Sequence, residues 1–347
     1  MTKRAGKIMI IAEAGVNHNG SLVIAKKMID RARQAGADWV KFQTFKTESL
    51  VSKRARKADY QKRNLKKSGS QDETDTQFEM LKKLELSEAQ FVKLKKYCEK
   101  LGIGFLSTPF DEESADLLEK MGIGMYKIPS GEITNLPFLK HVARKGKPII
   151  MSTGMADLAE VKEALRVIYA AGNRKVTVLH CTTEYPAPFR EVNLMAMITM
   201  RKSLKVPVGY SDHTPGIEVS IAAAALGACV IEKHFTLNKK MEGPDHRASL
   251  EPHELEAMVR SIRNIEKALG DGIKRPSQGE KKVALVARKS VVAVRDLKKG
   301  AEIREEDIGI KRPGDGIAPK YFKKVIGKRA KRNIREGDTL KWKMLMS

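Results

Sequence analysis

Two histidines occupy matching places in the sequence, each directly after a short apolar run that is typical of a buried strand. His213 ends the string Val-Gly-Tyr-Ser-Asp-His, and His234 ends the string Val-Ile-Glu-Lys-His. Neutral imidazoles at the carboxyl ends of two successive strands can share one metal ion. A lone histidine could simply cap its strand, but two in matching positions favour a metal site. Asp212 and Glu232, which lie close to them in sequence, are candidates for orienting the imidazoles.

Two lysines and several hydroxyl groups also stand at predicted strand ends. Lys41 and Lys127 are accompanied by small hydroxyl side chains at Ser130, Ser152 and Ser211. Buried cations with hydroxyl groups and glycine-bearing loops suit a phosphate or a carboxylate. One lysine could serve an internal salt bridge, whereas two with several hydroxyls favour an anionic substrate. A lysine could instead form a Schiff base, as in barrel aldolases, but an imine mechanism has no use for the histidine pair.

Four carboxylates fall near the same predicted strand ends: Glu13, Glu132, Glu232 and Asp245. Each could act as a general base or accept a hydrogen bond from a substrate hydroxyl. For any one of them, an ion pair with a nearby lysine is an equally reasonable interpretation. Other polar side chains end the same strands or follow them, namely Gln43, Thr108, Thr183 and Tyr185.

Apolar runs and amphipathic stretches alternate along most of the chain. Strands are expected at Ile8–Ala12, Trp39–Gln43, Gly104–Ser107, Met125–Ile128, Pro148–Ser152, Lys175–His180, Pro207–Tyr210 and Cys229–Lys233. Helices are expected between and after them, for example at Leu22–Gln34, Glu88–Leu101, Glu113–Met121, Leu158–Ala171, Ile217–Leu226 and Pro252–Ala268. Eight such units in about 270 residues predict an α/β fold, a (β/α)8 TIM barrel over residues 1–270, with its active site at the carboxyl ends of the strands.

Two segments depart from this alternation. Residues 44–86 form a long, basic and mostly polar insertion, which on a barrel is typical of a lid or a binding loop. Residues 271–287 are rich in turn formers and predict a linker. Residues 288–347 predict a small β-rich domain with an internal repeat, because Arg295–Ile303 and Arg332–Leu340 share the pattern Arg-x-(Leu/Ile)-x-x-Gly-x-x-(Ile/Leu).

Composition excludes several classes of protein. The chain has 347 residues and no apolar stretch of 18, so neither a membrane span nor a signal peptide is expected. Its three cysteines form no disulfide framework and favour the reducing cytoplasm. The net charge of +24 comes largely from residues 51–70 and 288–347, without zinc fingers or interleaved aromatics. We therefore expect no nucleic-acid partner, and we interpret the charge as a solvated surface or a field that attracts anionic substrates.

The strings at the strand ends resemble the sialic acid synthase family. The match runs in order through Glu-Ala-Gly-Val-Asn-His-Asn-Gly (13–20), Lys-Phe-Gln (41–43), Tyr-Lys-Ile-Pro-Ser-Gly-Glu (126–132), Ser-Thr-Gly-Met (152–155), His-Cys-Thr-Thr-Glu-Tyr-Pro (180–186), Gly-Tyr-Ser-Asp-His-Thr (209–214) and Ile-Glu-Lys-His-Phe-Thr (231–236). In the C-terminal part, Ile-Lys-Arg-Pro-Gly-Asp-Gly-Ile (310–317) is similar to the family's antifreeze-like (SAF) domain.

The resemblance implies condensation of phosphoenolpyruvate with an N-acetylated hexosamine and water, giving a nonulosonic acid and phosphate. It implies a Mn²⁺ or Mg²⁺ ion on His213 and His234, and proton transfer by Glu13. It also implies a homodimer in which Arg312 of one SAF domain reaches the partner's barrel. The implied catalytic residues are Glu13, Lys41, Lys127, Glu132 and Glu232, and the implied substrate-binding residues are Gln43, Thr108, Ser130, Ser152, Thr183, Tyr185, Ser211, Asp245 and Arg312.

Within these roles, the lysines and serines would hold phosphoenolpyruvate, and Glu132, Tyr185 and Asp245 would contact the sugar. One position departs from part of the family. Members that make N-acetylneuraminate can carry Asn where this chain has Thr183, and the segment Glu242–Leu250 looks at least as much like the legionaminate branch. The expected sugar is therefore either N-acetylmannosamine or a diacetamido-trideoxyhexose, with N-acetylneuraminate or legionaminate as the product.

Overall fold

The computed structural model describes residues 6–67 and 76–346, and it divides into two compact units, Met1–Asp271 and Gly272–Ser347. The predicted insertion 44–86 is therefore described except for residues 68–75, which lie outside the described residues. Within the described part of the chain, no helix is long and apolar enough to cross a membrane.

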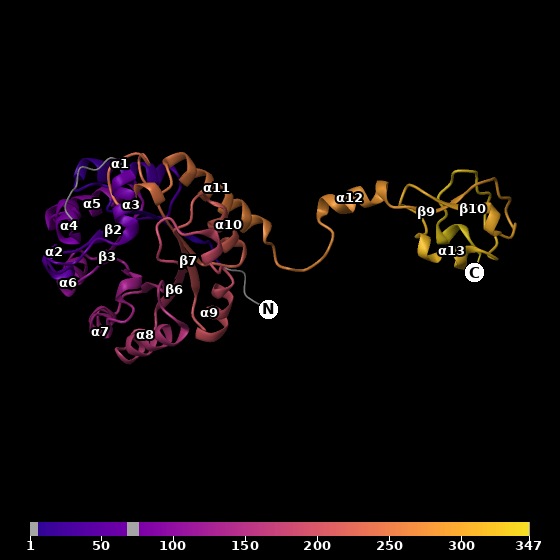
Figure 1. The fold of residues 1–347 in the computed structure, drawn as a ribbon. Coiled ribbons are helices and arrows are strands. Elements are labelled where there is room, and N and C mark those ends of the chain that lie inside the picture. The colour runs from indigo at the N-terminus through magenta and orange to yellow at the C-terminus, as the bar shows by residue number, and fades with distance from the viewer. Residues whose placement is uncertain (1–5, 68–75, 347) are drawn as a thin grey trace. The chain divides into compact units, whose positions relative to one another are not determined.

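The first unit is built on eight parallel strands. They are β1 (Met9–Gly15), β2 (Trp39–Thr44), β3 (Gly104–Pro109), β4 (Tyr126–Ile128), β5 (Ile149–Ser152), β6 (Val176–Cys181), β7 (Val208–Asp212) and β8 (Val230–His234). Hydrogen-bonded neighbours follow the order β3-β2-β1-β8-β7-β6-β5-β4, and the end strands β3 and β4 contact each other, so the sheet closes into a barrel. The predicted TIM-barrel fold is thus confirmed (Figure 1).

Eight helices pack around the outside of these strands (Figure 1). They are α1 (Leu22–Gln34), α5 (Glu88–Leu101), α6 (Glu112–Lys120), α7 (Leu136–Arg144), α8 (Leu158–Ala170), α9 (Ala196–Leu204), α10 (Glu218–Ala225) and α11 (Pro252–Ala268). Local sequence fixes their ends: α5 begins at a capping box of Ser87 and Gln90 and ends at Gly102, whose φ of 65° suits glycine.

The apolar residues separate into a large outer core and a small inner one. The outer core joins the strands to the surrounding helices. The inner core consists of Ile11, Leu106, Ile150, Leu179 and Val230, one residue from each of five strands. Because side chains alternate between the two faces of a strand, the residue two positions further along each strand faces the same interior. The inner core therefore lies directly beneath the inward-facing side chains at the carboxyl ends of the strands.

The described residues of the insertion after β2 form three short helices: α2 (Thr47–Leu50), α3 (Asp59–Lys67) and α4 (Gln77–Leu84). Despite its basic composition, it contributes Phe45, Leu65, Met80, Leu81 and Leu84 to a small core that Val16, which follows β1, completes. Helix α2 is tied to α4 by the ion pair between Lys82 and Glu48, at 2.9 Å. The segment is thus a packed subdomain beside the barrel mouth.

The second unit contains α12 (Gln278–Ala287), β9 (Ser290–Ala293), β10 (Ile308–Lys311) and α13 (Phe322–Val325). Helix α12 lies within the segment predicted as a linker. The sequence repeat appears as paired hydrogen bonds related by the 37-residue offset: Lys299 N donates to Asn333 Oδ1 at 2.8 Å, and Glu336 N donates to Asp296 Oδ1 at 2.8 Å. Leu297 and Ile334, equivalent in the two copies, exchange backbone hydrogen bonds. The expected pseudo-symmetric β-rich fold is confirmed.

Gly209 on β7 is required by close packing inside the barrel. A Cβ atom there would lie 2.5 Å from the backbone oxygen of Val230 and 2.6 Å from Leu179 Cδ2. Because a backbone carbonyl in a central strand cannot move aside cheaply, we predict that Gly209→Ala lowers the unfolding free energy by about 1–3 kcal/mol. Gly124→Ala, whose Cβ would have ordinary contact with Trp39 at 3.8 Å, is the control. Equal denaturant midpoints for the two variants would contradict this packing.

Candidate active site

The inward-facing residues directly above the inner core form one complete polar layer. Each strand contributes one member, two positions after an apolar residue or, on β7, after Gly209. The eight members are Glu13, Lys41, Thr108, Lys127, Ser152, Cys181, Ser211 and Glu232. All eight line one cavity of about 410 Å³ at the carboxyl ends of the strands. The side chains predicted singly from the strand ends are therefore brought together by the period-two alternation of the strands.

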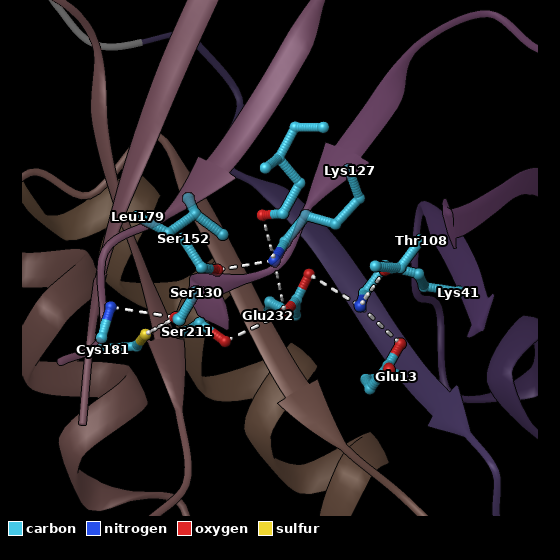
Figure 2. Close-up of polar contacts among 12 residues, drawn as sticks. Glu13, Lys41, Thr108, Lys127, Ser130, Ser152, Leu179, Cys181, Ser211 and Glu232 are labelled. Atoms are coloured by element: carbon cyan, nitrogen blue, oxygen red, sulfur yellow. Dashed lines mark hydrogen bonds and ion pairs between the residues drawn. The ribbon is translucent and has the colours of Figure 1, made fainter. Parts of the chain in front are cut away.

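Four charged members of this layer form a connected cluster, which Figure 2 shows in close-up. Lys41 Nζ lies 3.0 Å from Glu13 Oε2 and 3.6 Å from Glu232 Oε2. Lys127 Nζ lies 3.5 Å from Glu232 Oε1. All four side chains are buried. Two cations and two carboxylates thus balance each other where a single unpaired charge would be very costly to bury.

Burial and mutual attraction act in opposite directions on these groups. Burial raises the pKa of Glu13 to about 7, against the effect of Lys41. Burial also lowers the pKa of Lys127, with Glu232 opposing it. For Lys41, burial is outweighed by Glu13 and Glu232, which raise its pKa. For Glu232, burial is outweighed by Lys127 and Lys41, which lower its pKa. Glu13 is therefore the carboxylate best suited to exchange a proton near neutral pH.

Hydroxyl groups complete the cluster. Lys41 Nζ donates to Thr108 Oγ1 at 3.0 Å, and Lys127 Nζ donates to Ser152 Oγ at 2.5 Å. Ser211 Oγ donates to Glu232 Oε1 at 2.9 Å. Each lysine therefore keeps a hydroxyl beside it, and together these donors suit an anion. Both interpretations of the lysines, as ion-pair partners and as cations at an anion site, fit this arrangement.

Ser130 and Gln43 lie at the edge of this cluster. Ser130 Oγ accepts from Gly154 N at 2.9 Å and lies 3.1 Å from the sulfur of Cys181. Gln43 Nε2 donates to Glu13 Oε1 at 3.3 Å. Cys181 belongs to the polar layer, but sequence reasoning did not select it, because one cysteine among several polar strand-end residues carries no distinctive pattern.

The two histidines lie together, with ring centroids 5.5 Å apart. Burial lowers the pKa of His213 to about 4 and that of His234 well below its ordinary value, so both imidazoles are neutral. His213 Nδ1 donates to the carbonyl of Thr182 at 2.6 Å, which leaves Nε2 with its lone pair. His234 Nδ1 is buried and has no hydrogen-bond partner among the described residues. The pair therefore fits a metal ion.

The rest of a coordination shell would have to come from elsewhere. Among residues 6–67 and 76–346 no group of three or more His, Cys, Asp or Glu side chains could hold a metal ion. The expectation that Asp212 orients His213 is not supported. Asp212 accepts from Thr214 and Ser220 and pairs with Lys233 at 2.9 Å, and the Thr182 carbonyl orients His213 instead.

The remaining predicted residues of the first unit surround the mouth of the cavity. Tyr185 stacks on His213, with ring centroids 4.2 Å apart. Glu132 is half-buried and accepts from Asn135 Nδ2 at 2.6 Å. Asp245 and Thr183 also line the cavity, and Thr183 Oγ1 is buried without a hydrogen-bond partner among the described residues. Arg312 is exposed and belongs to the second unit, so the structure does not place it relative to this cavity.

Asn64 of the insertion is a residue that sequence reasoning missed. Its Nδ2 donates to the carbonyl of Pro244 at 2.8 Å and to the carbonyl of Tyr185 at 3.3 Å. It thereby joins the loop after β6 to the loop after β8, which carries Asp245. No sequence signal could have identified it, because a side-chain amide that bonds distant backbone carbonyls leaves no periodic pattern.

Known protein families match both units of the chain. The NeuB family model matches residues 28–274, and the SAF domain model matches residues 288–346. The chain is 52% identical over 337 residues to the N,N'-diacetyllegionaminic acid synthase of Campylobacter jejuni, covering 96% of this chain and 99% of that protein. It is 49% identical to the N,N'-diacetyllegionaminic acid synthase of Legionella pneumophila, covering 96% and 93%.

A solved structure shares the architecture. The N-acetylneuraminic acid (sialic acid) synthetase of Leptospira borgpetersenii serovar Hardjo-bovis, in complex with citrate, matches with a TM-score of 0.70 and 33% sequence identity. The match covers 80% of this chain and 90% of that chain.

The carboxyl group of Asp245 gives a pH-dependent test of the cavity. Burial alone raises its pKa from 3.8 to about 6. Because the folded pKa is the higher one, the protonated form stabilises the fold below pH 3.8, and this stability is lost as pH rises through 6. We predict that Asp245→Asn gains stability relative to the wild type between these values, by up to about 3 kcal/mol. Denaturant unfolding at several pH values measures this, and a pH-independent difference would contradict it.

Proposed function

The chain belongs to the NeuB family, and from this premise we propose that it is a transferase that condenses phosphoenolpyruvate with an N-acetylated hexosamine and water. The products are a nonulosonic acid and phosphate. The observation that carries the proposal is the polar layer, in which two buried lysines and four hydroxyl or thiol groups line one cavity. With Glu13 protonated, this layer carries a net positive charge, so it suits a small polyanion better than a neutral ligand.

In this proposal Lys41 and Lys127 hold the phosphate and carboxylate of phosphoenolpyruvate, with Ser130, Ser152 and Ser211 as hydroxyl donors. The lysines are placed before substrate arrives, because Glu13 and Glu232 fix their positions. Donors that need no rearrangement can stabilise charge as it develops, which is the largest contribution in many enzymes.

The reaction is a carbon–carbon bond formation followed by hydration. The enol carbon of phosphoenolpyruvate attacks the aldehyde of the open-chain sugar, and positive charge develops at the carbon that bears phosphate. Water adds there, and the tetrahedral intermediate expels phosphate. Glu13, with a pKa of about 7, is the group proposed to give a proton to the aldehyde oxygen and to take one from the water that adds. The lysines offset the negative charge of phosphate throughout.

His213 and His234 are the residues that would hold a Mn²⁺ or Mg²⁺ ion. When bound, such an ion polarises the sugar aldehyde as a Lewis acid. The fit rests on two neutral imidazoles, one oriented by the Thr182 carbonyl and the other with a buried Nδ1 that lacks a hydrogen-bond partner among the described residues.

We propose a legionaminate-type product, made from a diacetamido-trideoxyhexose. The support is the identity of 52% and 49% to two N,N'-diacetyllegionaminic acid synthases, against 33% to the N-acetylneuraminic acid synthetase structure. Glu132, Tyr185, Thr183 and Asp245 at the mouth are the proposed sugar contacts. We also propose a homodimer in which the exposed Arg312 of one chain completes the partner's site. A location in the cytoplasm is proposed as well, and the three free cysteines support it.

The reaction itself is tested by phosphate release. The protein is incubated with Mn²⁺, phosphoenolpyruvate and a panel of N-acetylated hexosamines, and phosphate and product masses are measured. We expect phosphate only when both substrates are present, with a product mass equal to the two substrates plus water minus phosphoric acid. Trapping of a keto acid on a lysine by borohydride, with turnover in excess chelator, would instead establish an aldolase.

Metal binding has a separate test that does not depend on turnover. We predict that Mn²⁺ titrated into the protein and followed by electron paramagnetic resonance shows one site per chain. His234→Ala should weaken this site by at least about 100-fold, because it removes a direct ligand. His180→Ala is the control, since His180 bonds the carbonyl of Val192 and lines a neighbouring cavity. Equal Mn²⁺ affinity in both variants would place the metal elsewhere.

A further inference from the structure

The cavity has two chemically different groups of lining residues. The polar layer of the barrel lines it, and so do five apolar side chains that pack in one cluster: Leu50, Val51, Met80, Leu81 and Phe110. We call these five residues the apolar wall. Four of them come from the insertion after β2, the segment whose composition predicted a polar lid or binding loop. Apolar groups therefore face a space that the barrel lines with charge.

The apolar wall is more than the edge of the insertion's core. Met80, Leu81 and Leu84 lie on one face of α4, as their helical spacing requires, and all three are core residues. Only the first two line the cavity, however, and Leu84 does not. Leu50 and Val51 are only partly buried and lie against this core. Leu50 and Val51 both line the cavity, whereas Leu84 offers a comparison residue that belongs to the same core and does not line it.

Two amide side chains of the insertion also line the cavity. They are Gln61 and Gln77, which come from the same segment as four residues of the apolar wall. The Oε1 of Gln61 accepts from Ala58 N at 2.9 Å, which leaves its NH2 group as a donor. An apolar surface with amide donors suits a ligand that carries both methyl groups and amide carbonyls. An acetamido group has this combination.

A fully hydroxylated sugar fits this surface poorly. Hydroxyl groups held against Leu50, Val51 and Phe110 would lose hydrogen bonds to water and gain none from the wall. A methyl group in the same place loses only unfavourable contact with water. The surface therefore discriminates between sugars by which positions bear methyl and acyl groups and which bear hydroxyls.

We infer that the apolar wall is the specificity-determining surface for the sugar, and that it selects an acceptor with acetamido and deoxy positions over a hydroxylated one. This inference rests on the proposed condensation reaction and assigns its substrate preference to the insertion. The polar layer binds phosphoenolpyruvate, and the wall takes the groups of the sugar that are remote from its aldehyde. Substitutions in the wall should therefore change the choice of sugar without changing the affinity for phosphoenolpyruvate.

The experiment compares kcat/KM for a diacetamido-trideoxyhexose and for N-acetylmannosamine at saturating phosphoenolpyruvate, using the full-length protein. We expect the wild type to prefer the first sugar by about 100-fold, the discrimination that an apolar pocket can exert against added hydroxyls. Leu50→Asn and Val51→Thr should each reduce this ratio about fivefold or more, with KM for phosphoenolpyruvate unchanged. Val51→Thr changes polarity at nearly constant shape, so it separates chemistry from packing.

Leu84→Ala is the matched control. It should lower the melting temperature, because Leu84 belongs to the same core, but leave the sugar ratio as in the wild type. The role of the wall is overturned if Leu50→Asn and Val51→Thr leave the sugar ratio unchanged, or if the wild type uses both sugars equally. The proposed reaction stands in either case. If neither sugar supports the release of phosphate, the proposed reaction itself is overturned, and the inference with it.

Discussion

The site depends on charge balance inside a closed barrel. Two lysines and two glutamates share a space with an apolar floor below it, and no single one of these charges could be buried alone without a large cost. Their mutual pairing keeps both lysines fixed. It also means that an incoming anion adds negative charge to a neutral cluster. In the proposed reaction, a protonated Glu13 and a divalent ion on the two histidines would compensate for that charge, and the net charge of +24 attracts the anion from solution.

The fold creates this cluster through a simple repeat. Every strand of the barrel places an inward residue in the inner core or beside it, and then a polar residue two positions later. The outer helices bury the alternate residues of the same strands. The loops that follow then add the histidines, the tyrosine and the insertion around this layer. The same strands thus carry the residues of the site and the residues that stabilise the barrel, because successive side chains face the interior and the surrounding helices in turn.

Much of this arrangement could be predicted from sequence because it is local. Short apolar runs located all eight strands, and the polar residues after them located the lysines, serines and histidines. The predictions that failed, and the features that were missed, depend on tertiary contacts. Asp212 was expected beside a histidine but pairs with Lys233, because a side chain next to His213 in sequence faces the opposite side of the strand. The core of the insertion and the hydrogen bonds of Asn64 depend on contacts between segments that are distant in the sequence, and composition does not predict such contacts. The role of Arg312 stays a prediction.

The most direct test of this account is a crystal structure of the protein with bound phosphoenolpyruvate. The account predicts phosphate and carboxylate oxygens within hydrogen-bonding distance of Lys41 Nζ and Lys127 Nζ, with the polar layer otherwise in the arrangement described above. Phosphoenolpyruvate bound outside this cavity, or both lysines still directed only to Glu13 and Glu232 with the anion held by other groups, would contradict it.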